Sequence, residues 1–272
     1  MSELLKRSVT GFFIVTVTLG AIILSRYSCL GLLCLINACA IYEFIGLNPV
    51  GISRSLRFQL SITLTLWLAF VGVSTILSWN TSLSFVSLPV LLALLTTFIL
   101  FQNIPADQVS KGARSLFSGA AYVTLPLGIG CLFFFEETKY AILILIPVFL
   151  IWTNDVGAYL IGSKWGNRKI SPAISPGKSM EGTMGGLVLC LVIAFVLTRI
   201  WPDIHPGYIW LLGGLVPFFA LAGDLYESSL KRAAGVKDSG SILPGHGGFL
   251  DRYDSFLFVL PVAALGYFIF AP

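Results

Sequence analysis

Acidic and basic side chains gather in residues 224–254, near the end of an otherwise apolar chain. On a helix, three of them would share one face with a serine because they are spaced by three and four residues: Asp224, Glu227, Ser228 and Lys231. An ionised carboxylate within an apolar run is costly, by about 2.5–3.5 kcal/mol at mid-bilayer, unless it is paired, hydrated or bound to metal. Asp224 is therefore a candidate metal ligand or an ion-pair partner of Lys231 or Arg232 at the membrane surface.

A glycine-rich loop follows this stretch and ends at two more carboxylates, Asp251 and Asp254. Its glycines let the backbone approach a ligand closely, and backbone N–H groups in such a loop can cradle phosphate oxygens. Countercharge comes from Lys231, Arg232, Lys237 and Arg252. This mixture suits Mg²⁺, which takes one or two carboxylates together with phosphate oxygens and stabilises charge during phosphoryl or nucleotidyl transfer.

Zinc is a poor alternative to magnesium for this chain. Its only two histidines, His205 and His246, lie in different loops, and its five cysteines form no C-x-x-C pair. We interpret His246 as a phosphate hydrogen-bond donor or a loop-fixing residue rather than a general base, and His205 as structural.

The composition predicts a membrane protein. The 272 residues are 56% hydrophobic and 11% charged, with a mean hydropathy of +0.90, whereas soluble domains are about 25% charged. The long apolar runs do not alternate in polarity, which favours helices over barrel strands. We therefore expect an all-α polytopic membrane protein, with no nucleic acid among its partners.

We count nine apolar segments and interpret them as transmembrane helices: 9–24, 29–47, 58–77, 83–101, 115–135, 140–162, 182–200, 208–227 and 255–271. The first follows Lys6 and Arg7 and lacks an A-x-A-like cleavage site, so we expect a retained span rather than a removed leader. We divide the chain into an N-terminal scaffold, 1–150, and a C-terminal catalytic region, 151–272.

The distribution of basic residues predicts the orientation. With a cytoplasmic N-terminus, only Arg26, Lys139 and Arg199 of the 17 Lys and Arg residues fall on the opposite side. Both long loops, 163–181 and 228–254, are then cytoplasmic. Two charged, glycine-containing loops on one face favour a site for a water-soluble, anionic substrate.

Two further polar residues lie in predicted helices. Asp155 lies in the sixth segment, where it could line a polar cavity leading to the site, belong to the site, or form an interhelical hydrogen bond. Glu43 lies near the cytoplasmic end of the second segment, and we interpret it as interfacial rather than catalytic, with its role left open.

Three stretches of the C-terminal region are similar to motifs of one family. The longest is Ser228-x-Leu230-Lys231-Arg232-x4-Lys237-Asp238-x-Gly240-x2-Leu243-Pro244-x-His246-Gly247-Gly248-Phe249-x-Asp251-Arg252-x-Asp254. It resembles the signature of the phosphatidate cytidylyltransferases, or CDP-diacylglycerol synthases, with Tyr253 in place of an aliphatic residue.

The other two stretches lie upstream. Ser175-Pro-Gly-Lys-Ser-Met-Glu-Gly182 is similar to the family's S-P-K-K-T-x-E-G motif, with Gly177 for a lysine and Ser179 for a threonine. Trp152-Thr-Asn-Asp-Val-Gly-Ala-Tyr159 resembles the acidic motif of the sixth span. The resemblance is strong over 150–272 and limited to a multi-span character before that.

The resemblance implies an enzyme that converts CTP and phosphatidic acid to CDP-diacylglycerol and pyrophosphate. It also implies an all-helical fold, Mg²⁺ dependence, a homodimer and a role for a monovalent cation such as K⁺. The two metal-linked aspartates map onto Asp224 and Asp251, and with Lys231 and Arg232 they form the expected catalytic set.

The expected substrate-binding residues are Ser175, Lys178, Glu181, Ser228, Lys237, Asp238, His246, Gly247, Gly248, Arg252, Asp254 and Asp155. The expected location is the bacterial inner membrane, with the active site facing the cytoplasm, where CTP from the cytosol can meet a lipid phosphate.

Two other functions fit part of the pattern. A transferase that acts on a polyprenyl phosphate would share the acidic loops and Mg²⁺. A secondary transporter would place polar sites in two matched halves near the midplane. Here the polar residues gather in the C-terminal third, which favours chemistry over transport.

Overall fold

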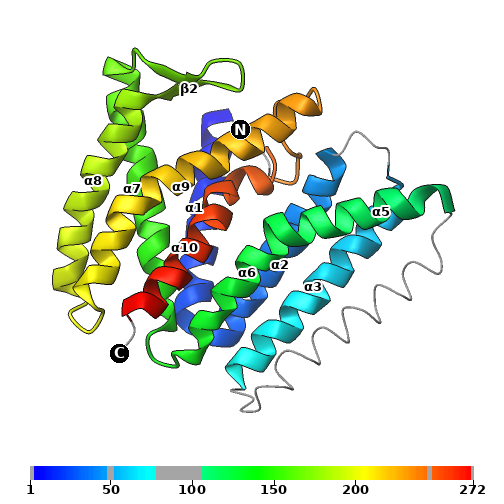
Figure 1. Ribbon diagram of the computed structural model, residues 1–272, viewed down its shortest axis with the longest axis horizontal. Helices are drawn as coiled ribbons and strands as arrows, with labels where there is room; N and C mark the ends of the chain where they lie inside the picture. Colours follow the sequence, from blue (N-terminus) through cyan, green and yellow to red (C-terminus); the bar gives the residue numbers. More distant parts are fainter. Residues whose placement is uncertain (1–2, 48–51, 78–105, 244–246, 271–272) are drawn as a thin grey trace. The chain divides into compact units, whose positions relative to one another are not determined.

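The computed structural model describes residues 3–47, 52–77, 106–243 and 247–270 (Figure 1). The chain divides into two compact units. The first comprises Met1–Ala141 and Ala233–Tyr253, and the second comprises Ile142–Arg232 and Asp254–Pro272. The predicted segment 83–101 and His246 lie outside the described residues. The functional division at residue 150 stays a prediction.

Long apolar helices make up most of the described chain. Six of them are long and apolar enough to cross a membrane within the described ranges: Arg26–Leu47, Arg54–Ile76, Ser110–Phe135, Tyr140–Trp165, Met180–Ile200 and Pro206–Ala233. Two shorter apolar helices cover Ser8–Leu24 and Asp254–Phe270. The chain is thus a helical polytopic membrane protein, as its composition predicts.

The first unit is built around two long neighbouring helices, α2 and α3 (Figure 1). Their contact includes polar bonds: Asn37 Nδ2 donates to Thr65 Oγ1 at 3.0 Å, and Ser61 Oγ donates to the Ala38 carbonyl at 2.6 Å. Such bonds replace the water that polar groups lack inside a bilayer. In the part of this unit that the structure describes, the α-helices are α1 (Glu3–Leu24), α2 (Arg26–Leu47), α3 (Arg54–Ile76), α5 (Ala106–Gly119) and α6 (Leu125–Gly130).

The helix predicted over 115–135 is interrupted. A π-helical turn, η1 (Ala120–Thr124), joins α5 to α6, and a 3₁₀ turn, η2 (Cys131–Phe135), follows α6. Pro126 near the start of α6 has no backbone N–H, and its ring collides with the carbonyl four residues earlier in a regular helix. The wider turn before it accommodates this proline.

The second unit contains four helices and one hairpin: α7 (Tyr140–Trp165), β1 (Lys169–Ser171), β2 (Ser175–Ser179), α8 (Met180–Ile200), α9 (Pro206–Ala233) and α10 (Asp254–Phe270). The two strands pair antiparallel within what the sequence predicted as a loop. At the end of β2, Ser179 caps α8 by accepting a hydrogen bond from the Gly182 N–H at 3.1 Å.

Glycines bring α7 and α8 into backbone contact. A Cβ atom added at Gly157 would lie 2.9 Å from the Gly185 carbonyl oxygen, and one added at Gly182 would lie 2.9 Å from the Ala158 oxygen. Small residues at a helix contact are typical of membrane bundles, where close backbone approach replaces the hydrophobic driving force. The two helices lie side by side in Figure 1.

Helix α9 extends beyond the apolar segment predicted to end at 227 and continues to Ala233. The polar residues from Asp224 to Lys231 therefore belong to one continuous helix, as their spacing predicts. Helix α10 begins against α9, because Ser255 Oγ donates to the Ala220 carbonyl at 3.2 Å. There is no room for a side chain at Gly223, since an added Cβ would lie 2.6 Å from the backbone carbonyl oxygen of Asp254.

Candidate active site

Three carboxylates of the second unit meet at the contact of α9 with α10. One oxygen from each of Asp224, Glu227 and Asp254 lies within 4.8 Å of the others. Glu227 is fully buried and Asp254 is 8% exposed. Glu227 lies one helical turn after Asp224, and the glycine contact at residue 223 brings the start of α10 to the same place.

Two lysines pair with this acidic cluster. Lys178 of strand β2 forms an ion pair with Asp224, and Lys231 Nζ lies 2.5 Å from Glu227 Oε2. Ser228 Oγ donates to the other oxygen of Asp224 at 3.3 Å. The hairpin therefore places Lys178 beside α9. The sequence alone did not predict which carboxylate this lysine pairs with.

The pKa of Lys178 follows from these neighbours. Burial by itself lowers this pKa, but the charge and hydrogen bond of Asp224 outweigh burial and raise the pKa above its ordinary 10.5. Asp155 and Asp254 act in the same direction. Because the folded-state pKa is raised, the stabilisation is present below about pH 10.5 and is lost as the pH rises through the raised value. Lys178 is therefore charged at neutral pH.

The balance of charge in the second unit favours a bound cation. Three carboxylates of the cluster, together with the nearby Asp155, face the ammonium groups of Lys178 and Lys231. Carboxylate oxygens at these separations suit Mg²⁺, which binds through one or two carboxylates and keeps other positions for water or phosphate. These residues fit the divalent ion expected from the sequence.

Two more predicted residues lie in this unit with weaker contacts. Arg232 Nε donates to the Ile174 carbonyl at 3.4 Å, which ties the end of α9 to the hairpin turn. Asp155 is exposed on α7, and Asn154 Nδ2 lies 3.5 Å from its carboxylate. Ser175 starts β2 and is half-buried.

Asp251 has a different set of partners, in the first unit. Its Oδ2 accepts the Ser239 N–H at 3.1 Å, the Ser239 hydroxyl at 3.1 Å and the Gly248 N–H at 2.9 Å. It therefore joins two ends of the glycine-rich loop. Its expected pairing with Asp224 around a metal ion stays a prediction.

Neither Glu43 nor Glu227 is among the predicted site residues, and from the sequence we interpret Glu43 as interfacial, with its role left open. Glu43 is 4% exposed on α2. Its Oε2 accepts the Ser239 hydroxyl at 2.9 Å and the Leu250 N–H at 2.8 Å. Partners about 200 residues away leave no local pattern in a sequence. The only signal was the presence of a carboxylate inside an apolar helix.

Two glycines of the loop are required by its geometry. Gly247 has φ +79°, a left-handed conformation that other residues rarely adopt. At Gly248 an added Cβ would lie 1.8 Å from Ser239 Oγ. The loop backbone is thus held tightly against the two carboxylates, as expected for a segment that presents N–H groups to a ligand.

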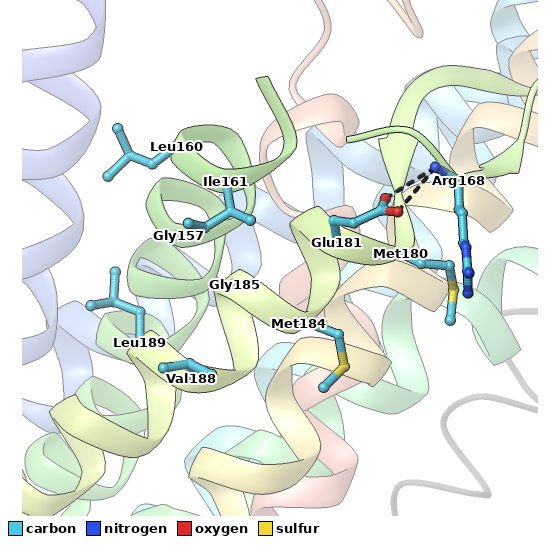
Figure 2. A pocket seen from close by; sticks show the side chains of 10 residues that line it. All are labelled: Gly157, Leu160, Ile161, Arg168, Met180, Glu181, Met184, Gly185, Val188 and Leu189. Carbon is cyan, nitrogen blue, oxygen red and sulfur yellow. Dashed lines mark hydrogen bonds between the residues drawn. The ribbon is translucent and has the colours of Figure 1, made fainter. Parts of the chain in front are cut away.

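The remaining predicted residues are exposed or lie beside a groove. Lys237, Asp238 and Arg252 are exposed in the first unit. Glu181 lies in the first turn of α8, and its two carboxylate oxygens accept the Arg168 backbone N–H at 3.2 and 3.1 Å. Both residues belong to the lining of a groove of about 680 Å³ along α7 and α8 (Figure 2).

Apolar helical spans with carboxylates and lysines clustered at the end of one of them define a class of membrane protein with a charged, partly buried site. The family model described as "Cytidylyltransferase family" matches residues 5–270. The chain belongs to this family.

Named relatives are similar to the chain over different lengths. It is 44% identical over 156 residues to the phosphatidate cytidylyltransferases of Staphylococcus epidermidis and Staphylococcus aureus, which is 55% of this chain and 59% of each relative. The chain thus spans about three fifths of these relatives. The chain is 35% identical over 253 residues to the phosphatidate cytidylyltransferase of Staphylococcus saprophyticus. This match covers 82% of the chain and 94% of the relative.

Proposed function

We propose that this protein is an enzyme that transfers the cytidylyl group of CTP to phosphatidic acid, giving CDP-diacylglycerol and pyrophosphate. The family and the names of its relatives support this activity. The observation that carries it is the ion pair of Lys178 with Asp224 within a cluster of buried carboxylates. A phosphate-binding cation and a metal-binding acid are the groups that nucleotidyl transfer requires.

Asp224 is the proposed centre of the Mg²⁺ site. From the resemblance, Asp251 is the second proposed ligand, and the geometry of the second unit adds Glu227 and Asp254 as candidates. When bound, the ion supplies positive charge that stabilises the negative charge developing on the transferred phosphoryl group. K⁺ is a proposed additional ion, from the resemblance.

The proposed reaction is a direct displacement. An oxygen of the lipid phosphate forms a bond to the α-phosphorus of CTP, and the bond from that phosphorus to the bridging oxygen breaks, so pyrophosphate leaves with the electron pair. Phosphate monoesters have a second pKa of about 6, so the attacking group is already largely ionised at neutral pH. No strong general base is required.

The chain's own cations then bind and orient the phosphates. Lys178 is charged and half-buried, so it can exchange its contact with Asp224 for a substrate phosphate. Lys231, Arg232 and the loop N–H groups would offset the charge of the leaving group. The other proposed substrate-binding residues are Ser175, Glu181, Ser228, Lys237, Asp238, His246, Gly247, Gly248, Arg252, Asp254 and Asp155.

The proposed setting is the bacterial inner membrane. We propose nine spans, a cytoplasmic N-terminus and an active site that faces the cytoplasm, supported by the asymmetry of Lys and Arg in the sequence. The homodimer implied by the resemblance completes the proposal.

An assay of the purified protein tests the function. Labelled CTP, phosphatidic acid and Mg²⁺ should give a labelled lipid and an equal amount of pyrophosphate, and omission of either substrate should give neither. Labelled product with a polyprenyl phosphate, but not with phosphatidic acid, would identify the rival transferase. Substrate movement into vesicles without any covalent product would identify a transporter.

A further inference from the structure

A groove runs along α7 and α8 in the second unit. Its volume is about 680 Å³, within the range of small-molecule sites. It is lined by Gly157, Leu160, Ile161, Arg168, Met180, Glu181, Met184, Gly185, Val188 and Leu189. Figure 2 shows Arg168 and Glu181 together at one end, with Val188 and Leu189 away from them.

The groove lies beside the close glycine contact of the two helices. Gly157 and Gly185 let the backbones approach, and longer apolar side chains stand on either side of this contact. Those side chains are not buried by protein: Leu160 is 50% exposed, Met184 50% and Val188 60%. In a membrane helix pair, such a surface contacts hydrocarbon rather than water.

The charged end of the groove distinguishes it from an ordinary lipid-facing surface. Arg168 offers a guanidinium group, which matches phosphate oxygens with several donors. Glu181 beside it accepts the Arg168 N–H, so part of its negative charge is directed at the protein backbone. The groove therefore has a polar end suited to an anionic headgroup and an apolar body.

The same end is joined by a short stretch of chain to the acidic cluster. Met180 and Glu181 follow directly after β2, the strand whose Lys178 pairs with Asp224. On α7, Gly157 of the groove lies two residues after Asp155, whose charge acts on Lys178. The lining of the groove is thus two residues along the chain from Lys178, at Met180, and two residues from Asp155, at Gly157.

We propose that this groove is the subsite for one acyl chain of the phosphatidic acid, with the lipid phosphate at the end marked by Arg168. This inference rests on the proposed cytidylyl transfer and adds to it the position of the lipid. From Met180 to Leu189, α8 rises about 14 Å, which is close to half of a hydrocarbon core about 30 Å thick. The groove accordingly matches the part of a chain that lies in one leaflet.

Substitution of Val188 by tryptophan tests the subsite. Val188→Trp should fill the groove, whereas Val192→Trp, one turn further along α8 at a similarly exposed residue, should not. For a phosphatidic acid with 16-carbon chains, we expect Val188→Trp to raise KM by about tenfold, as for lost burial of about two methylene groups. For dihexanoyl phosphatidic acid, both variants should stay within about twofold of the unmodified protein.

The outcomes separate this inference from the proposed function. An equal effect of Val188→Trp on both lipids, or equal effects of the two tryptophans, would overturn the subsite. Without any lipid product from the unmodified protein, the proposed function itself fails.

A measurement without turnover provides a second test. A phosphatidic acid with a diazirine on one acyl chain, irradiated with the purified protein, should label residues 157–161 and 184–189. Labelling there should fall when unlabelled phosphatidic acid is added, but not when phosphatidylcholine is added. Labelling spread evenly over all apolar helices, with no competition, would show only bulk lipid at this surface and would overturn the proposal.

Discussion

Both carboxylate oxygens of Asp224 have a partner among the polar side chains of the second unit. One of its oxygens pairs with Lys178 and the other accepts from Ser228. A carboxylate satisfied on both sides needs no metal ion to be tolerated at this position. The neighbouring Glu227 and Asp254 add negative charge that the lysines only partly offset. That excess is the physical reason to expect a cation beside Asp224 when nucleotide binds.

Removing the charge of Asp224 tests this interpretation. Asp224→Asn keeps the size and can still bond Ser228, so the protein should remain folded. Formation of CDP-diacylglycerol should fall by about 10²–10³-fold or more, because the proposed Mg²⁺ site would lose the charge of one carboxylate ligand. Asp203→Asn, at an exposed residue, serves as the control. Turnover of Asp224→Asn close to that of the control would refute the assignment.

Glu43 permits a separate test of the loop. In Glu43→Ala, the Leu250 N–H and the Ser239 hydroxyl lose a buried acceptor, which should cost about 1–3 kcal/mol of folding free energy. The consequence should be local: faster amide exchange over residues 239–250 and a raised KM for CTP, with KM for the lipid unchanged.

The matched control for Glu43 is Asn37→Ala on the same helix. Asn37 is fully buried, and its Nδ2 donates to Thr65 Oγ1 of α3 at 3.0 Å. Asn37→Ala should lower the melting temperature about as much as Glu43→Ala does, without changing amide exchange at residues 239–250 or KM for CTP. If both variants behave alike, Glu43 contributes only to general stability.

At the scale of elements, the contact of α7 with α8 depends on the absence of side chains. Gly157→Ala would place a Cβ atom 2.9 Å from the Gly185 oxygen, so the helices must move apart. We expect a loss of about 1–3 kcal/mol, typical of overpacking, seen as a lower melting temperature in detergent.

Gly214→Ala on α9 is the control for that substitution. An added Cβ there meets nothing within 4 Å. Because alanine is the better helix former by about 1 kcal/mol, this variant should be neutral or slightly more stable. Equal destabilisation at both positions would show that the loss reflects something other than contact of the two helices.

The helices themselves could be predicted because hydrophobic length is a local property. Predicted segments 29–47 and 182–200 correspond to α2 (Arg26–Leu47) and α8 (Met180–Ile200). The hairpin over Lys169–Ser179 was not predicted, since its strands are short and polar. The π-helical turn before Pro126 was also missed, because the apolar run conceals where its hydrogen bonding changes.

The site was predictable where it follows helical spacing and not where it depends on tertiary contacts. Asp224 and Lys231 are seven residues apart, which is about two helical turns, so their common face could be predicted. The partner of Lys178 and the place of Glu43 depend on how distant segments fold together, for which one sequence has no local pattern.

For the molecule as a whole, the testable prediction is orientation. With nine spans and a cytoplasmic N-terminus, Pro172 in the hairpin turn faces the cytoplasm and Asp203 faces the opposite side. Both residues are exposed. Asp203→Cys should react with a membrane-impermeant maleimide in intact cells, and Pro172→Cys only after permeabilisation.

The native cysteines set the background of maleimide labelling in this measurement. Three of the five are buried and two are partly buried, so the unmodified protein should label weakly. Reaction of Pro172→Cys in intact cells would reverse the predicted topology and place the acidic cluster on the wrong side for cytosolic CTP.

The bonds that Glu43 makes to Ser239 and Leu250 bear on how small a working version of this protein can be. A polypeptide trimmed to residues 151–272 would keep every motif recognised in the sequence yet lose the carboxylate that fastens both ends of the glycine-rich segment. Co-expression with a separate piece that contains α2 would supply this carboxylate again. A shortened protein without the early helices would therefore lack Glu43 and its bonds to this loop.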